Sequence, residues 1–158
     1  MSLSTPLSSA IRPPKQPISV LVVIHTPAQE ILLLERAAHP GYWQSVTGSR
    51  EDDESLRETA RREVAEETGI DSTQYVLREW HYSNHYEIFP EWRHRYAPGV
   101  TSNQEFVFSL CLPQKQAIRL APDEHRAYCW LPWQQAATRC FSWSNRDAIQ
   151  LLSLLAPA

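Results

Sequence analysis

A nearly unbroken run of apolar, mostly β-branched residues over 18–24 is the clearest hydrophobic pattern in the chain. A run of this kind is typical of a strand that is covered on both faces. A second short apolar run over 31–34 follows a turn segment at 25–30, and alternating apolar and polar residues predict a strand over 105–112. We expect further strands over 43–47, 74–81 and 127–131.

Three segments predict helices, and the one over 56–68 has the clearest ends. Ser55 and Glu58 have the spacing of a capping box, and Gly69 suits the residue that follows a helix. Two further helices are expected at the end of the chain, a short one near 133–138 and a longer one over about 145–155 with Ser144 as its candidate N-cap.

This order of elements predicts an α+β domain in which a mixed sheet lies between layers of helices, rather than a regular βαβ series. We expect residues 18–158 to form this single domain. Residues 1–17 are rich in proline and serine, so we expect them to form an extended leader that is partly disordered.

The composition excludes several classes of function. The chain has 158 residues, 42% of them hydrophobic, and a net charge of −3, so it has no general attraction to nucleic acid or to an anionic membrane. It contains no apolar run of about 18 residues that could span a bilayer. Cys111, Cys129 and Cys140 lack CxxC spacing and are interpreted as reduced thiols of a cytoplasmic protein, or simply as buried small hydrophobes. His81 and His85 fall where a strand is expected to give way to a loop, so we predict no zinc site there.

The helix over 56–68 places two carboxylates among its apolar residues. At about 100° per residue, Glu63 and Glu67 fall on the apolar stripe and Glu66 lies on its flank. A solvated face would explain the other charges, but unpaired carboxylates at the edge of the core would cost several kcal/mol. Arg62 could offset this cost, yet a divalent cation offsets it better, because hard oxygen ligands suit Mg²⁺ or Mn²⁺. We therefore favour a metal site over a structural salt-bridge cluster.

The stretch over 48–70 resembles a complete Nudix box, because it reads Gly48-x5-Glu54-x7-Arg62-Glu63-Val64-x-Glu66-Glu67-x-Gly69-Ile70. The resemblance implies the Nudix α/β/α sandwich with a mixed, curved β-sheet. It also implies hydrolysis of a nucleoside diphosphate linked to another group, with a divalent metal held on the box helix. Asp53 stands where many members of the family have glycine, and aspartate tolerates a left-handed backbone better than most residues.

The same resemblance implies roles for individual residues. Glu63 and Glu67 are expected to be the main metal ligands, Glu66 a further one, and Glu124 matches the third metal carboxylate of the family, late in the chain. The supporting residues are Arg62, which orients a glutamate, and Glu54, which fixes the loop. The general base is either Glu63 or a carboxylate outside the box. The expected cofactor is Mg²⁺, with Mn²⁺ as a substitute.

Segments outside the box also carry a resemblance. Those over 42–49, 93–101 and 142–146 are similar to the members of the family that act on 7,8-dihydroneopterin 3′-triphosphate in folate biosynthesis. This implies the release of pyrophosphate and the formation of dihydroneopterin monophosphate. The substrate contacts that the resemblance implies are Lys15 and Arg36 for the phosphates, and Thr47, Tyr86, Glu87, Ile88, Phe89 and Ser142.

Other activities stay open at this point. The box binds only phosphate and metal, so it does not exclude a broader nucleoside triphosphate pyrophosphohydrolase, for example one that acts on dATP. A non-catalytic Nudix binding module fits less well, because every glutamate of the box is present. RNA 5′-end hydrolysis is not favoured by the charge. We expect a small-molecule triphosphate as the partner, no nucleic acid or membrane, and a monomer or weak homodimer.

Overall fold

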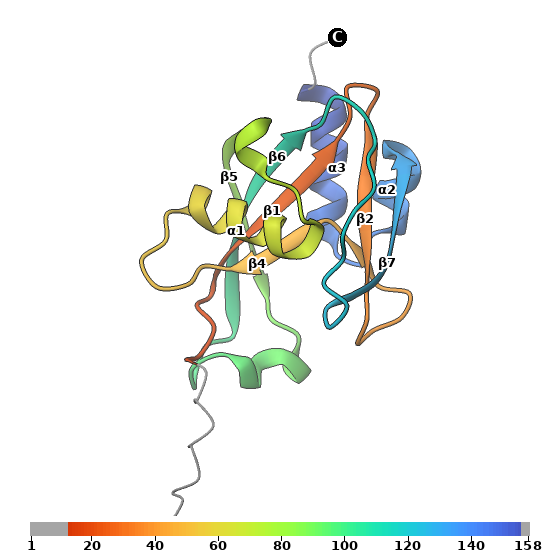
Figure 1. Cartoon of the computed structure of the whole chain (residues 1–158). Coiled ribbons are helices and arrows are strands. Elements are labelled where there is room, and N and C mark those ends of the chain that lie inside the picture. Colours follow the sequence, from red (N-terminus) through yellow and green to blue (C-terminus); the bar gives the residue numbers. More distant parts are fainter. Residues whose placement is uncertain (1–12, 156–158) are drawn as a thin grey trace, which may run out of the picture.

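The computed structural model of the chain describes residues 13–155 (Figure 1). Residues 1–12 of the expected leader therefore lie outside the described residues. At the end of the leader that is described, the backbone N–H of Lys15 donates to the carbonyl of Arg95 at 2.8 Å. In the described part of the chain, no helix has both the length and the apolar character that crossing a membrane requires.

The α+β class and the mixed sheet that the sequence predicts are confirmed. The sheet has seven strands: β1 (Ile18–His25), β2 (Glu30–Arg36), β3 (Trp43–Gln44), β4 (Val46–Ser49), β5 (Val76–Glu87), β6 (Ser102–Cys111) and β7 (His125–Pro132). The helices are α1 (Leu56–Thr68), α2 (Trp133–Arg139) and α3 (Trp143–Leu155), and two short 3₁₀ helices are η1 (Ser72–Gln74) and η2 (Pro90–Arg95).

The sheet divides into two arms that meet at the β1–β2 connection. One arm contains β5, β6, β1 and β4, with β1 and β6 parallel, and the other contains β7, β2 and β3. Only one pair of residues, His25 and Ile31, links β1 to β2. The two arms therefore diverge along their length.

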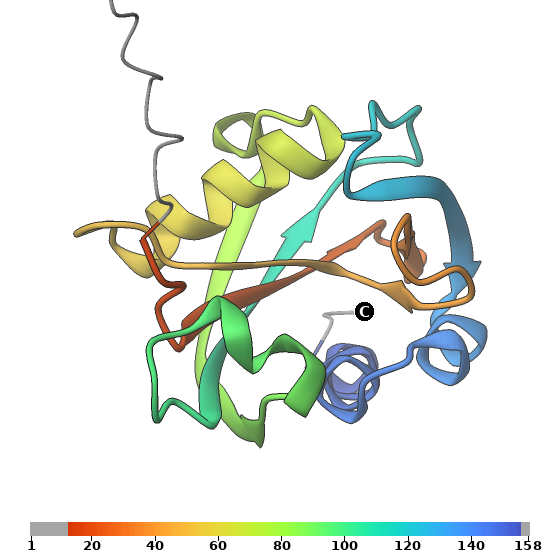
Figure 2. The ribbon, with the colours of Figure 1, turned by 90° about the horizontal axis from the view of Figure 1, so that it is seen from below.

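Two apolar cores lie on opposite faces of the sheet. Along β1, Val20, Val22 and Ile24 belong to the core under α1, whereas Leu21 and Val23 belong to the core under α2 and α3. Figure 2 shows α1 on one face and α2 and α3 on the other. The continuous apolar run of β1 is explained by this burial on both faces.

Helix α1 has the bounds that the sequence predicts. Ser55 and Glu58 form the reciprocal capping box, and Gly69 ends the helix with a φ of 75°. In the loop before the helix, however, the left-handed residue is Asp52, with a φ of 48°, and not Asp53 as expected. The turn over 51–54 is still formed, with the N–H of Glu54 donating to the carbonyl of Glu51 at 3.1 Å.

The single strand expected over 43–47 is wrong, because Ser45 separates β3 from β4. The side chain of Asn145 causes the break. Its Oδ1 accepts from the Ser45 N–H at 2.8 Å, and its Nδ2 donates to the Ser45 hydroxyl at 3.0 Å. At this point the chain leaves β2 and joins β1 in the other arm.

Two other boundaries also differ from the prediction. β5 does not end at residue 81 but continues to Glu87, because a register shift lets it regain its pairing with β6 from Ser83 onward. His81 has a φ of 55° within this shift. α3 begins before the expected residue 145, and Ser142 rather than Ser144 caps it, with the Ser142 hydroxyl accepting from the Asn145 N–H at 3.3 Å.

We predict that Asn145→Ala destabilises the protein by about 2–3 kcal/mol, because it removes two buried hydrogen bonds and leaves the Ser45 N–H unpaired. Urea unfolding followed by circular dichroism measures the change. Gln150→Ala, at an exposed position of the same helix, is the control and should change stability by less than about 0.5 kcal/mol. Equal effects of the two substitutions would contradict this role of Asn145.

Candidate functional site

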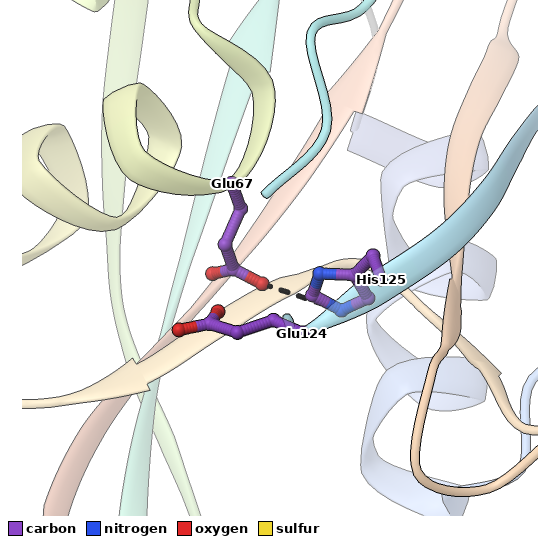
Figure 3. Close-up of side chains that lie close together, drawn as sticks. All are labelled: Glu67, Glu124 and His125. Carbon is purple, nitrogen blue, oxygen red and sulfur yellow. Dashed lines mark ion pairs between the residues drawn. The ribbon is translucent and has the colours of Figure 1, made fainter. Parts of the chain in front are cut away.

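Acidic side chains of α1 meet the beginning of β7 at one place. Ligand atoms of Glu67, Glu124 and His125 all lie within 4.8 Å of one another (Figure 3). Glu67 and His125 are buried, with exposed fractions of 1% and 3%, and Glu124 is exposed. The His125 Nε2 atom lies 3.5 Å from Glu67 Oε1. The arrangement offers two carboxylates and one imidazole from two separate parts of the chain.

Glu63 lies one helical turn before Glu67 and is 8% exposed. The two carboxyl groups are close enough for each to change the pKa of the other. Glu63 packs directly on β4, where a Cβ atom added to Gly48 would lie only 2.0 Å from the Glu63 Cδ atom. Only glycine at this position allows the carboxylate to lie against the strand.

Arg62 connects the helix to the loop that precedes it. Its guanidinium donates to Glu54 at 2.8 and 3.0 Å, to Glu63 at 2.8 Å and to Glu66 at 3.3 Å. It also donates to the Ser49 carbonyl at 2.9 Å. The hydrogen bond from Arg62 lowers the pKa of Glu54. Arg62 thus fixes one oxygen of Glu63, and Glu66 lies exposed on the flank, as its helical position predicts.

Burial changes the protonation of the site. Burial raises the pKa of Glu63 to about 7, and Arg62 only partly opposes this. Burial and the neighbouring Glu63 raise the pKa of Glu67 well above its usual range. Burial also lowers the pKa of His125 to about 4, so its imidazole is neutral. Two adjacent carboxyl groups therefore retain a proton near neutral pH unless another positive charge neutralises them.

The residues of the site fit a divalent cation. Among the described residues, Glu67 Oε2 has no hydrogen-bond partner although it is buried. A buried carboxylate oxygen without a donor is costly. Oxygen atoms of Glu63, Glu67 and Glu124 are ligands that Mg²⁺ and Mn²⁺ accept, and neutral His125 adds one nitrogen. A cation held here would satisfy the free oxygen and displace the shared proton.

Two of the expected substrate contacts border this site. Arg36, at the end of β2, donates to Gln44 at 3.4 Å and lies 4.7 Å from the centre of the Trp92 ring. Burial and nearby Arg95 lower the pKa of Arg36, whereas Glu67 and Glu124 oppose this change. The Thr47 backbone lies close enough to Glu67 to lower the pKa of its carboxyl group. Arg36 and Thr47 are thus brought to the acidic cluster, and Lys15 is exposed nearby, within electrostatic reach of Glu63.

The other expected contacts lie at the end of β5, in the two residues before η2 and just before α3. Tyr86 accepts a hydrogen bond from Asn103 at 2.9 Å, and Ser142 caps α3. Glu87 and Phe89 are exposed, whereas Ile88 is buried. The Ile88 carbonyl accepts from the Arg93 side chain at 3.0 Å. Ile88 therefore positions η2 and does not present its side chain at the surface.

Aromatic rings from three loops gather beside Arg36. Their contacts are between His39 and Tyr42, His39 and Trp92, Tyr42 and Phe141, Phe89 and Trp92, and Trp92 and Phe141. The ring centroids of the stacked Tyr42 and Phe141 are 4.9 Å apart. A flat bicyclic ring could pack against this group, which the sequence pattern did not reveal as a cluster.

His125 was missed by the sequence analysis. It follows Glu124 directly, but a single histidine beside a carboxylate has no spacing that indicates a ligand. Its contact with Gln44, at 3.5 Å, depends on the pairing of β2 with β7. It lies two residues before the strand predicted over 127–131, so no local pattern marked it as part of the site.

Comparisons with known proteins agree with this geometry. The NUDIX domain family matches residues 15–152. The chain is 46% identical to the dihydroneopterin triphosphate diphosphatase of Escherichia coli (strain K12) over 139 residues, which are 86% of this chain and 91% of that protein. It is 39% identical to the protein of the same name from Haemophilus influenzae, over 84% of each chain.

The fold is also similar to solved structures. The structure of the E. coli dihydroneopterin triphosphate pyrophosphohydrolase matches with a TM-score of 0.84 and 44% identity, over 90% of this chain and 99% of that one. A NUDIX hydrolase structure from Listeria monocytogenes matches with a TM-score of 0.72 and 26% identity, over 87% of this chain and 92% of that one.

We predict that Gly48→Ala weakens Mn²⁺ binding by about tenfold or more, because the new methyl group displaces the Glu63 carboxylate. The clashing atoms belong to the mobile end of a side chain, so the loss of stability should stay below about 2 kcal/mol. Isothermal titration calorimetry with Mn²⁺ measures the affinity. In a Glu63→Ala background, where the clash is absent, Gly48→Ala should change the affinity less than about twofold. An unchanged affinity in Gly48→Ala alone would contradict the predicted displacement.

We also predict that the metal-free protein becomes less stable relative to Glu63→Gln as the pH rises from 6 to 8. The folded-state pKa of Glu63, about 7, lies above its ordinary value of 4.5. The folded protein therefore binds the proton more tightly, and this contribution is lost as the pH rises through about 7. Thermal melts of both proteins in EDTA measure the difference, with Glu79→Gln on β5 as a control. A difference that does not change with pH would contradict the raised pKa.

Proposed function

The chain belongs to the Nudix family, and from that premise we propose that it is a Mg²⁺-dependent dihydroneopterin triphosphate diphosphatase. In this reaction water attacks a phosphorus atom of 7,8-dihydroneopterin 3′-triphosphate, pyrophosphate leaves, and the monophosphate remains. The observation that carries the proposal is the acidic cluster, in which a buried oxygen of Glu67 has no hydrogen-bond partner among the described residues. The chain that holds this cluster is similar to such enzymes over most of its length.

Each charged group of the site has a part in this proposal. Glu63, Glu67 and Glu124 hold the cation, and His125 supports Glu67. A divalent cation bound there would neutralise the negative charge of the carboxylates and phosphates and would acidify water. Without it, the carboxylates of the site would repel a triphosphate.

Glu63 is the proposed proton acceptor. Arg62 holds one of its oxygens through a 2.8 Å hydrogen bond and leaves the other free to act. Glu66, which accepts a hydrogen bond from Arg62, is the proposed further ligand of the cation.

Cationic and aromatic groups bind the two ends of the substrate. Arg36 and Lys15 stabilise the phosphates, including the negative charge that develops on the leaving pyrophosphate. Besides Thr47, the remaining proposed contacts lie at the end of β5, in the segment before η2 and just before α3. Those contacts are Tyr86, Glu87, Ile88, Phe89 and Ser142.

Hydrolysis of dATP is the second candidate function, because the acidic cluster and the arginine recognise only the phosphates. A non-catalytic binding role is disfavoured by the complete set of box glutamates in the site. A role on RNA 5′ ends is disfavoured by the net charge of −3.

The test is a substrate panel with purified protein and Mg²⁺. We predict that kcat/KM for dihydroneopterin triphosphate exceeds that for dATP by about tenfold or more. Glu63→Gln should reduce kcat by about 100-fold or more, because it removes both a ligand and the proton acceptor, and Glu79→Gln should leave kcat within about twofold. A tenfold preference for dATP, or turnover that persists in EDTA, would overturn the proposal.

A further inference from the structure

A second group of buried polar side chains lies on the sheet face that carries α3. Ser19, Asn84, Asn103 and Glu105 come from three neighbouring strands and are 2–7% exposed. The strand register brings them together, because Glu105 pairs with Ser19 on one side and with Asn84 on the other. The apolar neighbours Leu21 and Val107 on the same face belong to the α2–α3 core, so these polar groups interrupt its edge.

Three atoms of this group have no hydrogen-bond partner within residues 13–155: Glu105 Oε1, Asn84 Nδ2 and Asn103 Oδ1. The other atoms of Asn103 are satisfied, because its Nδ2 donates to Ser19 Oγ at 2.7 Å and to the Tyr86 hydroxyl at 2.9 Å. Each free buried polar atom costs about 1–3 kcal/mol. Two free acceptors and one free donor in neighbouring side chains form a pattern that a polar ligand could complete.

The group lies on the sheet face opposite α1, and the strands β1 and β4 connect it to the acidic site. Ser19 is two residues from Leu21 on β1, and Leu21 pairs with Thr47, whose backbone lowers the pKa of Glu67. Tyr86 is close enough to Arg36 to raise its pKa, and it lowers the pKa of Glu105. Its hydroxyl also accepts from Asn103 of the same group. A substrate whose phosphates bind beside Arg36 and Glu67 would therefore place its other end near Glu105.

A purely structural role would account poorly for Glu105. Burial raises the pKa of Glu105 to about 7, and the hydroxyls of Ser144 and Tyr86 only partly oppose this. A carboxyl group that served only to join α3 to the sheet would need one oxygen and could be replaced by a neutral amide. The free second oxygen indicates that a further donor is expected from outside the protein.

We propose that Glu105 determines specificity by accepting hydrogen bonds from the amidine edge of a 2-amino-4-oxo pyrimidine ring, the ring that pterins and guanine share. This inference rests on the proposed function and identifies how the ring end of that substrate is recognised. The ring N–H and the exocyclic amino group donate to the carboxylate, while Asn84 Nδ2 offers a donor to the ring carbonyl. Adenine has an acceptor at the equivalent ring nitrogen and would leave the carboxylate unpaired. Glu105 is 4% exposed, so binding of the ring requires that the side chains covering it move aside.

The test compares four substrates in the presence of Mg²⁺: dihydroneopterin triphosphate, GTP, ITP and dATP. ITP is GTP without the 2-amino group, so their ratio isolates one donor. We expect kcat/KM of the wild type to be about tenfold or more higher for GTP than for ITP. In Glu105→Gln this ratio should fall to within about twofold, dihydroneopterin triphosphate should lose about tenfold or more, and dATP should change less than about threefold.

Glu79→Gln, a carboxylate on the neighbouring strand β5, is the matched control and should change none of the four values by more than about twofold. Equal losses for all four substrates in Glu105→Gln, or a wild-type GTP-to-ITP ratio below about two, would overturn the inference. The wild-type ratio decides the matter even if Glu105→Gln does not fold. The proposed function is tested separately. It fails if the wild type has a kcat/KM for dATP that is about tenfold higher than that for dihydroneopterin triphosphate.

Discussion

The burial of two adjacent carboxyl groups on α1 is the constraint on which the site depends. Glu63 and Glu67 lie on the face of the helix that also supplies Ala60 and Val64 to the core. Burial and mutual repulsion both favour the neutral forms of the two carboxyl groups, and Arg62 beside Glu63 only partly opposes this. A shared proton compensates for the burial in the metal-free protein, and a divalent cation does so in the proposed active form.

Other features of the fold follow from that constraint. Gly48 lets the Glu63 carboxylate lie on the strand, and Arg62 fixes its outer oxygen while it ties down the loop through Glu54. The diverging arms of the sheet bring the start of β7 beside α1, so Glu124 and His125 reach Glu67. The chain passes from one arm to the other at Ser45, between β3 and β4. Asn145 of α3 holds Ser45 there through two hydrogen bonds.

Local patterns in the sequence predicted the parts of the site that depend on local structure. The capping box and the terminal glycine set the bounds of α1, and helical periodicity placed Glu63 and Glu67 on its buried face. The fold and the family were available from the Nudix box, because it is a long pattern within one stretch of chain. Glu124 was placed by resemblance to the family and not by any spacing.

Features that depend on pairing between distant strands could not be predicted. His125, the Asn145–Ser45 contact and the Glu105 group arise from strand register and helix docking, to which the single sequence gives no access. The continuation of β5 past His81 has the same origin, because pairing with β6 resumes after an irregular segment that reads locally as a loop.

The most direct test of this account is the number of protons released when Mg²⁺ binds. Titration calorimetry at pH 6.5, repeated in buffers with different ionisation enthalpies, measures this number. If the cation replaces a proton shared by Glu63 and Glu67, about one proton should leave for each cation bound. Binding without proton release would show that the carboxylates were already ionised and would contradict the central claim.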